Sequence, residues 1–185
     1  MTLQAKDRPA GFETSLKKKI SLSDGKDVEV DFLRLAFPRT EQSIKNSYGG
    51  KNLVSYKGDV MFAELAIRRK LIDAGWSAQW ISGNYYLEKW IDEPFTKQEK
   101  KPLQELPCWN LLSQIDKQCV KLFSGHIPNS CDGCWDVVAW KDDRILFVES
   151  KHKDTITPSQ EKWLAAALSA GLNLDDFIVV KWQYE

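Results

Sequence analysis

The chain has no excess of charge of either sign. Its 26 Lys and Arg residues are balanced by 26 Asp and Glu residues, so the formal net charge is zero over 185 residues. This balance excludes a protein that attracts nucleic acid through an overall basic field. Any surface that binds phosphate must instead be a local cluster of cations.

Long apolar stretches are also absent. The sequence has no run of about 18 apolar residues, and it does not open with the charged and then apolar pattern of a secretory leader. We therefore expect neither a membrane span nor a membrane partner. The expected protein is soluble and intracellular, either cytoplasmic or associated with the nucleoid.

Cysteine is scarce, and its placement leaves two interpretations open. Cys131 and Cys134 have the spacing of a zinc knuckle, whereas ten residues separate Cys108 from Cys119, so the second half of the usual zinc pattern is missing. In an intracellular chain, reduced thiols or a metal site are expected rather than disulfides. The four residues either bind a structural Zn²⁺ or are buried unpaired thiols.

Aromatic residues, in contrast, are plentiful. Eight Trp residues and a hydrophobic content of 43% favour a folded core over a disordered chain. The length suits a single domain, 1–185, with insertions. We divide it into an N-terminal arm and strand at 1–58, a core at 59–91 and 131–183, and an insertion that carries cysteines at 92–130.

The N-terminal part contains one clear strand pattern. Residues 1–25 are polar and show little periodicity, which predicts a loose arm that ends in a turn. The lysine run at 17–19 is either solvated or in contact with a phosphate backbone. Apolar residues alternate over 26–37, with a change of phase that predicts a strand with a bulge or bend. Residues 39–58 are expected to form a long loop.

The first helix pattern covers residues 59–74. Asp59 is a suitable N-cap, and Gly75 is a suitable residue just beyond the helix end. Glu64 falls on the apolar stripe of this helix. It either lies at the edge of the stripe and reaches water, or it points towards a metal ion.

Three cations are candidate contacts for nucleic acid. Arg68 and Arg69 lie on or near the side of this helix opposite the apolar stripe, and Lys153 follows a later strand. Such a group either faces phosphate or belongs to a solvated surface.

The middle of the chain predicts a hairpin, a connector and a helix. Residues 76–81 and 85–91 alternate on either side of a turn, which is typical of a second hairpin. The stretch 92–107 contains three Pro among many charges and is expected to be an exposed connector. Apolar positions over 109–123 predict a helix.

A further hairpin is predicted around the polar tetrad Lys141–Arg144, because short apolar runs flank it on both sides. If the tetrad is the loop, Asp136 faces Glu149 across the two strands, with their Cβ atoms roughly 5 Å apart. Lys151 shares that face of the sheet. A shift of one residue in the pairing would place the two carboxylates on opposite faces.

Facing carboxylates repel each other, so a fold tolerates them where a proton or a cation lies between them. A divalent metal ion shared by Asp136 and Glu149 is one interpretation. The other is a solvated strand end, in which Glu149 and Lys151 form an ordinary surface pair.

The last helix has the clearest limits in the sequence. Thr157 and Gln160 form a capping-box pattern with a proline between them, and Gly171 marks the end. Together with strands at 145–149 and 177–182, this helix makes a crossover unit. Such units pair their strands in parallel, so we predict a mixed α/β fold with helices covering a central sheet.

Asp136, the strand end at 149–151 and Gln160 together resemble the PD-(D/E)xK nucleases, the restriction-endonuclease-like superfamily. The resemblance is strongest to the VRR-NUC type, a small nuclease module also found at the end of some DNA-repair nucleases. The stretches FAELAIRRKLIDAGW and TPSQEKWLAAALSAG are similar to helices of that type. One departure is Trp135, which stands where the family has a proline before the aspartate.

The resemblance implies an αβββαβ core and a site that binds Mg²⁺ or Mn²⁺. The implied ligands are all oxygen atoms, from the side chains of Asp136, Glu149 and Glu64 and the main-chain carbonyl of Ser150. Lys151 would position the attacking water or stabilise the transition state, and Gln160 would order the site.

The implied activity is metal-dependent hydrolysis of phosphodiester bonds in nucleic acid, with DNA favoured over RNA and endo or exo cleavage left open. A homodimer is expected if both strands are cut. The alternative is a catalytically inactive module of the same fold that binds nucleic acid or protein, with or without a stabilising zinc ion.

Overall fold

A computed structural model describes residues 8–40, 51–91 and 97–185. In this part of the chain, three α-helices accompany a mixed sheet of eight strands and a separate two-stranded hairpin. The strands are β1 (Lys17–Ser21), β2 (Asp27–Phe37), β3 (Leu53–Tyr56), β4 (Asp59–Phe62), β5 (Ser77–Ser82), β6 (Tyr85–Ile91), β7 (Lys97–Pro102), β8 (Val137–Lys141), β9 (Arg144–Lys151) and β10 (Phe177–Tyr184). The helices are α1 (Ala63–Asp73), α2 (Trp109–Leu122) and α3 (Pro158–Ser169).

The strands of the large sheet follow the order β1-β2-β10-β9-β8-β5-β6-β7. β10 pairs in parallel with both β9 and β2, and the other neighbours pair antiparallel. The predicted crossover β9–α3–β10 is therefore confirmed. Because β9, β10 and β2 run in one direction, their carboxyl ends meet at one edge, which is where open α/β sheets bind ligands.

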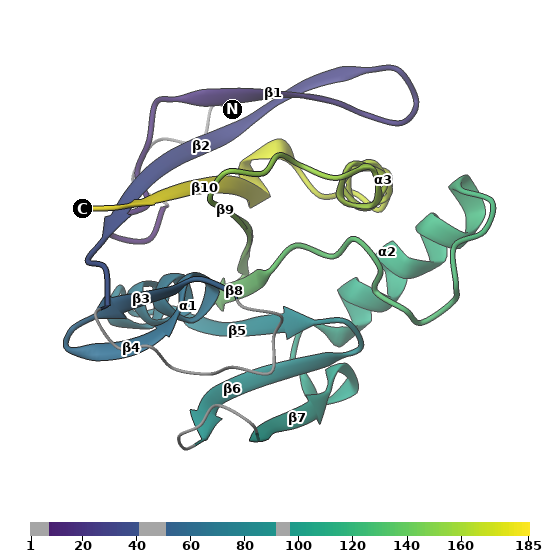
Figure 1. Cartoon of the computed structure of the whole chain (residues 1–185). Helices are drawn as coiled ribbons and strands as arrows, with labels where there is room; N and C mark the ends of the chain where they lie inside the picture. The colour runs from purple at the N-terminus through teal and green to yellow at the C-terminus, as the bar shows by residue number, and fades with distance from the viewer. Residues whose placement is uncertain (1–7, 41–50, 92–96) are drawn as a thin grey trace.

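Two apolar cores lie on opposite faces of the large sheet. One face packs against α2 and α3, and the other packs against α1 and the β3–β4 hairpin (Figure 1). The central strands are buried on both faces, as expected of parallel strands between helices. None of the described helices is long and apolar enough to cross a membrane.

The start of the first helix differs from the prediction. Asp59 does not cap it but opens β4, which pairs with β3 in a hairpin, and the helix begins four residues later at Ala63. Residues 53–56, predicted as loop, are therefore a strand, whereas 41–50 lie outside the described residues. The predicted end is confirmed: Gly75 has a φ of +79°, and its N–H donates to the carbonyl of Ile72.

Two further stretches form strands that were not predicted. Residues 17–21, placed in the loose arm, pair as β1 with β2. Residues 97–102, placed in the exposed connector, pair as β7 with β6, while 92–96 lie outside the described residues. Both are edge strands, each with a single neighbouring strand in the large sheet.

The phase change in β2 has a simple origin. Its pairing with β1 and β10 is regular, without the predicted bulge. Val28, Val30 and Phe32 contact the core beneath α3, whereas Leu33 and Leu35 contact the core on the opposite face. One unbroken strand thus serves both cores in succession. The hairpin β5–β6 and helix α2 match their predictions.

Candidate active site

The side chains predicted to form a site line one pocket of about 340 Å³ at the carboxyl end of β9. Residues from α1, β9, α3 and the entry to β8 contribute to it. The predicted members are Glu64, Asp136, Glu149, Ser150, Lys151 and Gln160. The fold therefore brings together residues that are up to 96 positions apart in the sequence.

The pairing of β8 with β9 is the predicted one. Val137 lies opposite Val148, so the next pair outward is Asp136 and Glu149. The Asp136 N–H donates to Glu149 Oε2 at 3.3 Å, and the Ser150 N–H donates to Asp136 Oδ2 at 2.9 Å. Each carboxylate thus accepts a main-chain hydrogen bond from the opposite strand. The loop itself is shorter than predicted, because Lys141 pairs with Arg144 and leaves two residues in the turn.

Glu149 is held by two side chains besides this main-chain bond. Its Oε1 accepts hydrogen bonds from Gln160 Nε2 at 2.6 Å and from Lys151 Nζ at 2.9 Å. Lys151 Nζ also donates to Gln160 Oε1 at 3.0 Å and to Asp154 at 3.2 Å. The glutamate is only 1% exposed, so these donors replace water around its charge.

Gln160 has a second contact, which sets the start of α3. Its Oε1 accepts the N–H of Thr157 at 2.9 Å, and its own N–H donates to Thr157 Oγ1 at 3.4 Å. The predicted capping box is confirmed. Because the Gln160 side chain both caps α3 and donates to Glu149, it holds the first turn of α3 against the pocket.

Electrostatics in the pocket favours a bound proton or cation. Burial, followed by repulsion from Glu149 and Glu64, raises the pKa of Asp136 well above its ordinary range. Burial also raises the pKa of Glu149, although Lys151 opposes that shift. Burial lowers the pKa of Lys151, but the contacts with Glu149 and Asp154 together outweigh it and raise the value overall. The two carboxylates therefore carry more negative charge than one lysine balances.

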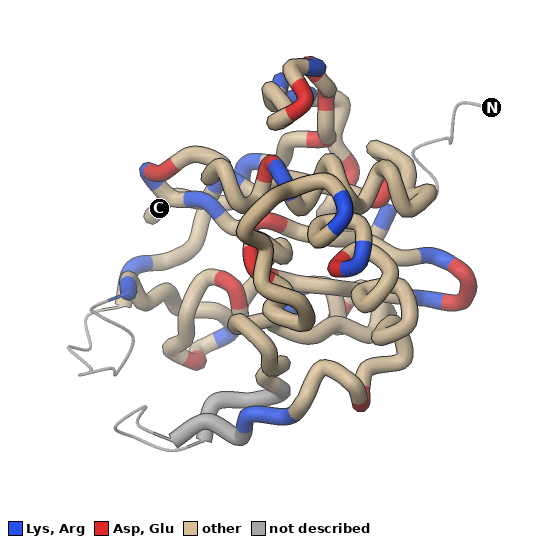
Figure 2. The backbone as a smooth tube through the Cα atoms, turned by 90° about the vertical axis from the view of Figure 1, so that its right-hand side faces the viewer, with Lys and Arg blue, Asp and Glu red and all other residues tan. Residues whose placement is uncertain are grey.

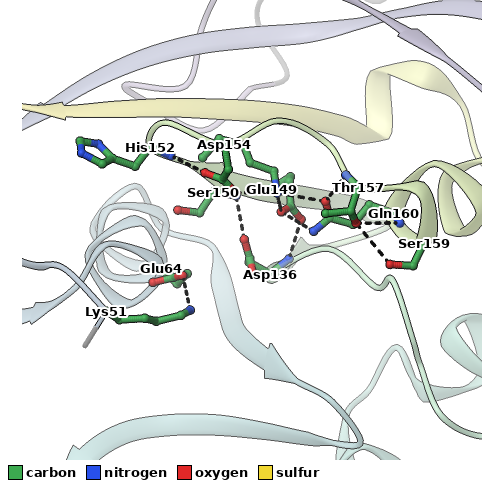
Figure 3. A network of polar contacts seen from close by, with 11 residues as sticks. Lys51, Glu64, Asp136, Glu149, Ser150, His152, Asp154, Thr157, Ser159 and Gln160 are labelled. Atoms are coloured by element: carbon green, nitrogen blue, oxygen red, sulfur yellow. Dashed lines mark hydrogen bonds and ion pairs between the residues drawn. The ribbon is translucent and has the colours of Figure 1, made fainter. Parts of the chain in front are cut away.

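These residues suit a hard divalent cation in their chemistry, because every donor is an oxygen atom. In the described chain, no three His, Cys, Asp or Glu side chains gather around one point. The reason at this pocket is the placement of Glu64. Its carboxylate meets Lys51 Nζ at 2.6 Å, and Figure 3 shows this pair on one side of Asp136, with Glu149 and Gln160 on the other.

Lys51 is a pocket residue that the sequence pattern did not reveal. Besides Glu64, its ammonium group faces the ring of Trp80 at 5.4 Å from the centroid. It lay in the predicted long loop, and no local periodicity marks it. His152 and Trp182 were missed as well; their rings stack at 4.2 Å and form one wall of the pocket.

The three candidate nucleic-acid contacts lie outside the pocket lining. Arg68 Nε donates to the carbonyl of Ala78 at 2.9 Å, and Arg69 pairs with Asp59 at 2.5 Å. Both arginines thus already contact neighbouring residues of the fold. Lys153 is exposed on the loop between β9 and α3, whose neighbouring residues border the pocket.

The four cysteines are free thiols, and they do not form a metal-binding group within the described residues. Burial raises the pKa of Cys108 to about 11 and that of Cys119 and Cys131 to about 12, and it raises the pKa of Cys134 as well. Thiols in such surroundings stay protonated and inert.

The loop around these thiols supports the pocket by packing. Trp135, the residue that departs from the family pattern, is fully buried, and its ring meets Phe177 edge-on at 5.1 Å. Gly133 has a φ of +79°, and a Cβ there would overlap the Ser159 carbonyl. The loop before Asp136 therefore lies directly against the first turn of α3, the turn that carries Gln160.

Comparisons of the chain with models of protein families, with curated proteins and with solved structures found no match. A function must therefore be argued from the pocket itself.

Proposed function

We propose that this chain is a divalent-metal-dependent nuclease that hydrolyses phosphodiester bonds in nucleic acid, with DNA favoured over RNA. The observation that carries the proposal is the pair of carboxylates on adjacent strands, Asp136 and Glu149, in an open pocket that also holds Lys151 and Gln160. A buried pair of this kind costs stability, and functional sites are where such costs are retained.

The order of elements supports the restriction-endonuclease-like assignment. Taken along the chain, α1, β5, β8, β9, α3 and β10 follow the αβββαβ pattern, and their four strands are neighbours in the sheet. β6, β7 and α2 then form an insertion between β5 and β8, and β1 and β2 extend the opposite edge. Trp135 replaces the family proline at a buried packing position, which leaves the carboxylate of Asp136 in the pocket.

Mg²⁺ or Mn²⁺ would be held by Asp136 and Glu149 with the Ser150 carbonyl, and by Glu64 once it is released from Lys51. When bound, the ion would activate water and neutralise charge on the phosphate. Glu149 is held in position by Gln160, whose amide is itself fixed by the helix cap.

Lys151 is the group best placed to contact the reacting phosphate or the attacking water. Its side chain is only 4% exposed, and contacts with Glu149 and Asp154 fix the position of the ammonium group and keep it charged. A fixed cation in a partly dry pocket stabilises charge that develops on phosphate oxygens more strongly than a mobile surface lysine would.

A cleavage panel tests the proposal. Labelled single-stranded, duplex, flapped and branched DNA, and RNA, are incubated with the protein in Mg²⁺, Mn²⁺ or EDTA. We expect cleavage that needs metal and is lost in Asp136→Asn. The matched control is Asp143→Asn, which removes the same charge from the exposed hairpin turn. Binding without cleavage under every condition would identify an inactive binding module instead.

A further inference from the structure

A row of cations leaves the pocket along the sheet. Lys151 on β9 lies opposite Lys181 on β10, and Lys181 lies opposite Arg34 on β2. Side chains alternate along a strand, and Phe147 and Val179 point to the face that packs against α3. Lys151 and Lys181, each an even number of residues further on, share that face. Residues opposite each other on paired strands also share a face, so Arg34 joins them.

Lys18 on β1 adds a fourth cation to this face, because it lies opposite Val30, which contacts the core beneath α3. Its Nζ lies 5.9 Å from the centroid of the Phe32 ring, and the guanidinium carbon of Arg34 lies 5.8 Å from the same centroid. Burial, followed by repulsion from Lys181 and Lys151, lowers the pKa of Lys18, although attraction to Asp154 opposes part of this shift. Lys18 therefore feels the charges of Lys181 and Lys151, and it shares the Phe32 ring with Arg34.

Three members of this row differ from Lys151 in their ion pairing. Lys18, Arg34 and Lys181 form no ion pair with any residue that the structure describes. The neighbouring Lys17 and Lys19, in contrast, pair with Asp31 and Asp27. Along the backbone drawn in Figure 2, Lys and Arg are intermixed with Asp and Glu. Cations left unpaired in a chain of zero net charge repel one another, and a bound anion relieves that cost.

The shape of the row indicates which anion. Lys151, Lys181 and Arg34 lie level on three adjacent strands about 4.8 Å apart, so they span roughly 10 Å. Lys18 lies opposite Val30, four residues back along β2 from Arg34. A single phosphate would fill only one interval of such a row. A polyanion with regularly spaced charges would meet all of it, and one end of the row is the pocket lysine, Lys151.

We propose that Lys181, Arg34 and Lys18 form a track for the sugar–phosphate backbone of one nucleic-acid strand, leading from the pocket across β10 and β2 to β1. The direction of the track rests on the proposed nuclease function, whereas binding to it does not require cleavage. Strand β1, which was not predicted, thereby gains a role, because it carries one of the three cations of the track.

Binding and salt dependence test this track. Wild type and a triple variant, Lys18→Gln, Arg34→Gln and Lys181→Gln, are titrated into fluorescent single-stranded DNA in EDTA at several salt concentrations. Each phosphate contact contributes about 0.7 to the slope of log K against log salt for single strands, so the slope should fall by about 2. At low salt, the affinity should fall at least tenfold.

The matched control removes three charges elsewhere, at the exposed Lys26, Lys117 and Lys121. It should leave the slope unchanged and alter the affinity no more than about threefold. Equal losses in both triple variants would overturn the track. Track-dependent binding of polyglutamate as tight as that of DNA would overturn the nucleic-acid assignment. If the triple variant unfolds, the single variant Lys181→Gln replaces it, with an expected loss of about 0.7 in slope.

Failure of the track and failure of the proposed nuclease activity have different signatures. With metal present, the triple variant should raise KM and leave kcat within about twofold. If the triple variant cleaves with a normal KM and shows an unchanged salt slope, the proposed track is refuted and the proposed nuclease activity stands. If binding depends on the three cations but the wild-type protein cleaves no substrate, the track is supported and the proposed nuclease activity is refuted.

Discussion

Asp136→Asn should make the metal-free protein more stable at neutral pH. The Asn side chain still offers an oxygen to the Ser150 N–H, so the hydrogen bond at 2.9 Å is kept. What is lost is one of two facing charges. At roughly 5 Å and an effective dielectric constant of about 20, two unit charges repel by roughly 3 kcal/mol. Lys151, 2.9 Å from Glu149, offsets part of this.

We therefore expect the substitution to raise the free energy of unfolding by about 1 to 2 kcal/mol, which is about 2 to 8 °C in Tm for a domain of this size. Thermal and urea unfolding in EDTA measure both quantities. Asp143→Asn, on the exposed turn, is the control and should change stability by less than about 0.5 kcal/mol.

The pH dependence of this difference has a definite sign. Burial, followed by Glu149 and Glu64, raises the pKa of Asp136 in the folded state, so the folded protein holds this proton more tightly than the unfolded chain does. The stability gained from that proton is fully present below about pH 4, the ordinary pKa of Asp, and is lost as the pH rises through the folded pKa. The advantage of the Asn variant should thus be small at pH 4 and grow towards neutral pH.

Metal should reverse the order of stability. If Mg²⁺ binds wild type with a dissociation constant of about 1 mM, about 10 mM would stabilise it by roughly 1.4 kcal/mol. The Asn variant, with one anionic ligand fewer, should gain much less. An Asn variant that is plainly less stable in EDTA, or equal Mg²⁺ shifts in both proteins, would refute a shared ion between Asp136 and Glu149.

Three further predictions concern the pocket and the thiols. Alanine at Glu149 should lower turnover at least about a hundredfold while DNA affinity stays within a few fold, because phosphate contacts supply most of the binding; quenched-flow cleavage and anisotropy measure the two. Thr157→Ala and Gln160→Ala should each lower the free energy of unfolding by about 1 kcal/mol, because each removes a helix cap. Only Gln160→Ala should also lower kcat. Equal losses of kcat in the two variants would contradict a role for the Gln160 amide at the pocket. Because burial raises the pKa of Cys119 and Cys131 to about 12, thiol reagents at pH 8 should label the native protein slowly and all four thiols rapidly after unfolding; one zinc ion per chain released on unfolding would show that the thiols are ligands instead.

Features that depend on neighbouring residues could be predicted from the sequence alone. The capping box at Thr157, the helix end at Gly75 and the pairing that places Asp136 opposite Glu149 are all confirmed. Each depends on a few adjacent residues or on a short hairpin, where local hydrogen bonds and the alternation of side chains leave one arrangement.

Features that depend on distant partners were decided only by the tertiary structure. β1, β4 and β7 exist because another strand offers them hydrogen bonds, and their own sequences do not distinguish strand from loop. Lys51 reaches the pocket because the β3–β4 hairpin lies beside α1.

The cation row shows the same division most clearly. Lys18, Arg34 and Lys181 are unremarkable surface residues in their own segments, separated by up to 163 positions in the sequence. Parallel pairing of β10 with β2 and β9 brings Lys181 and Arg34 level with Lys151, and antiparallel pairing with β2 brings Lys18 to the same face. Local pattern determines which face of its own strand a side chain occupies, but only the pairing of distant strands determines which charges become neighbours.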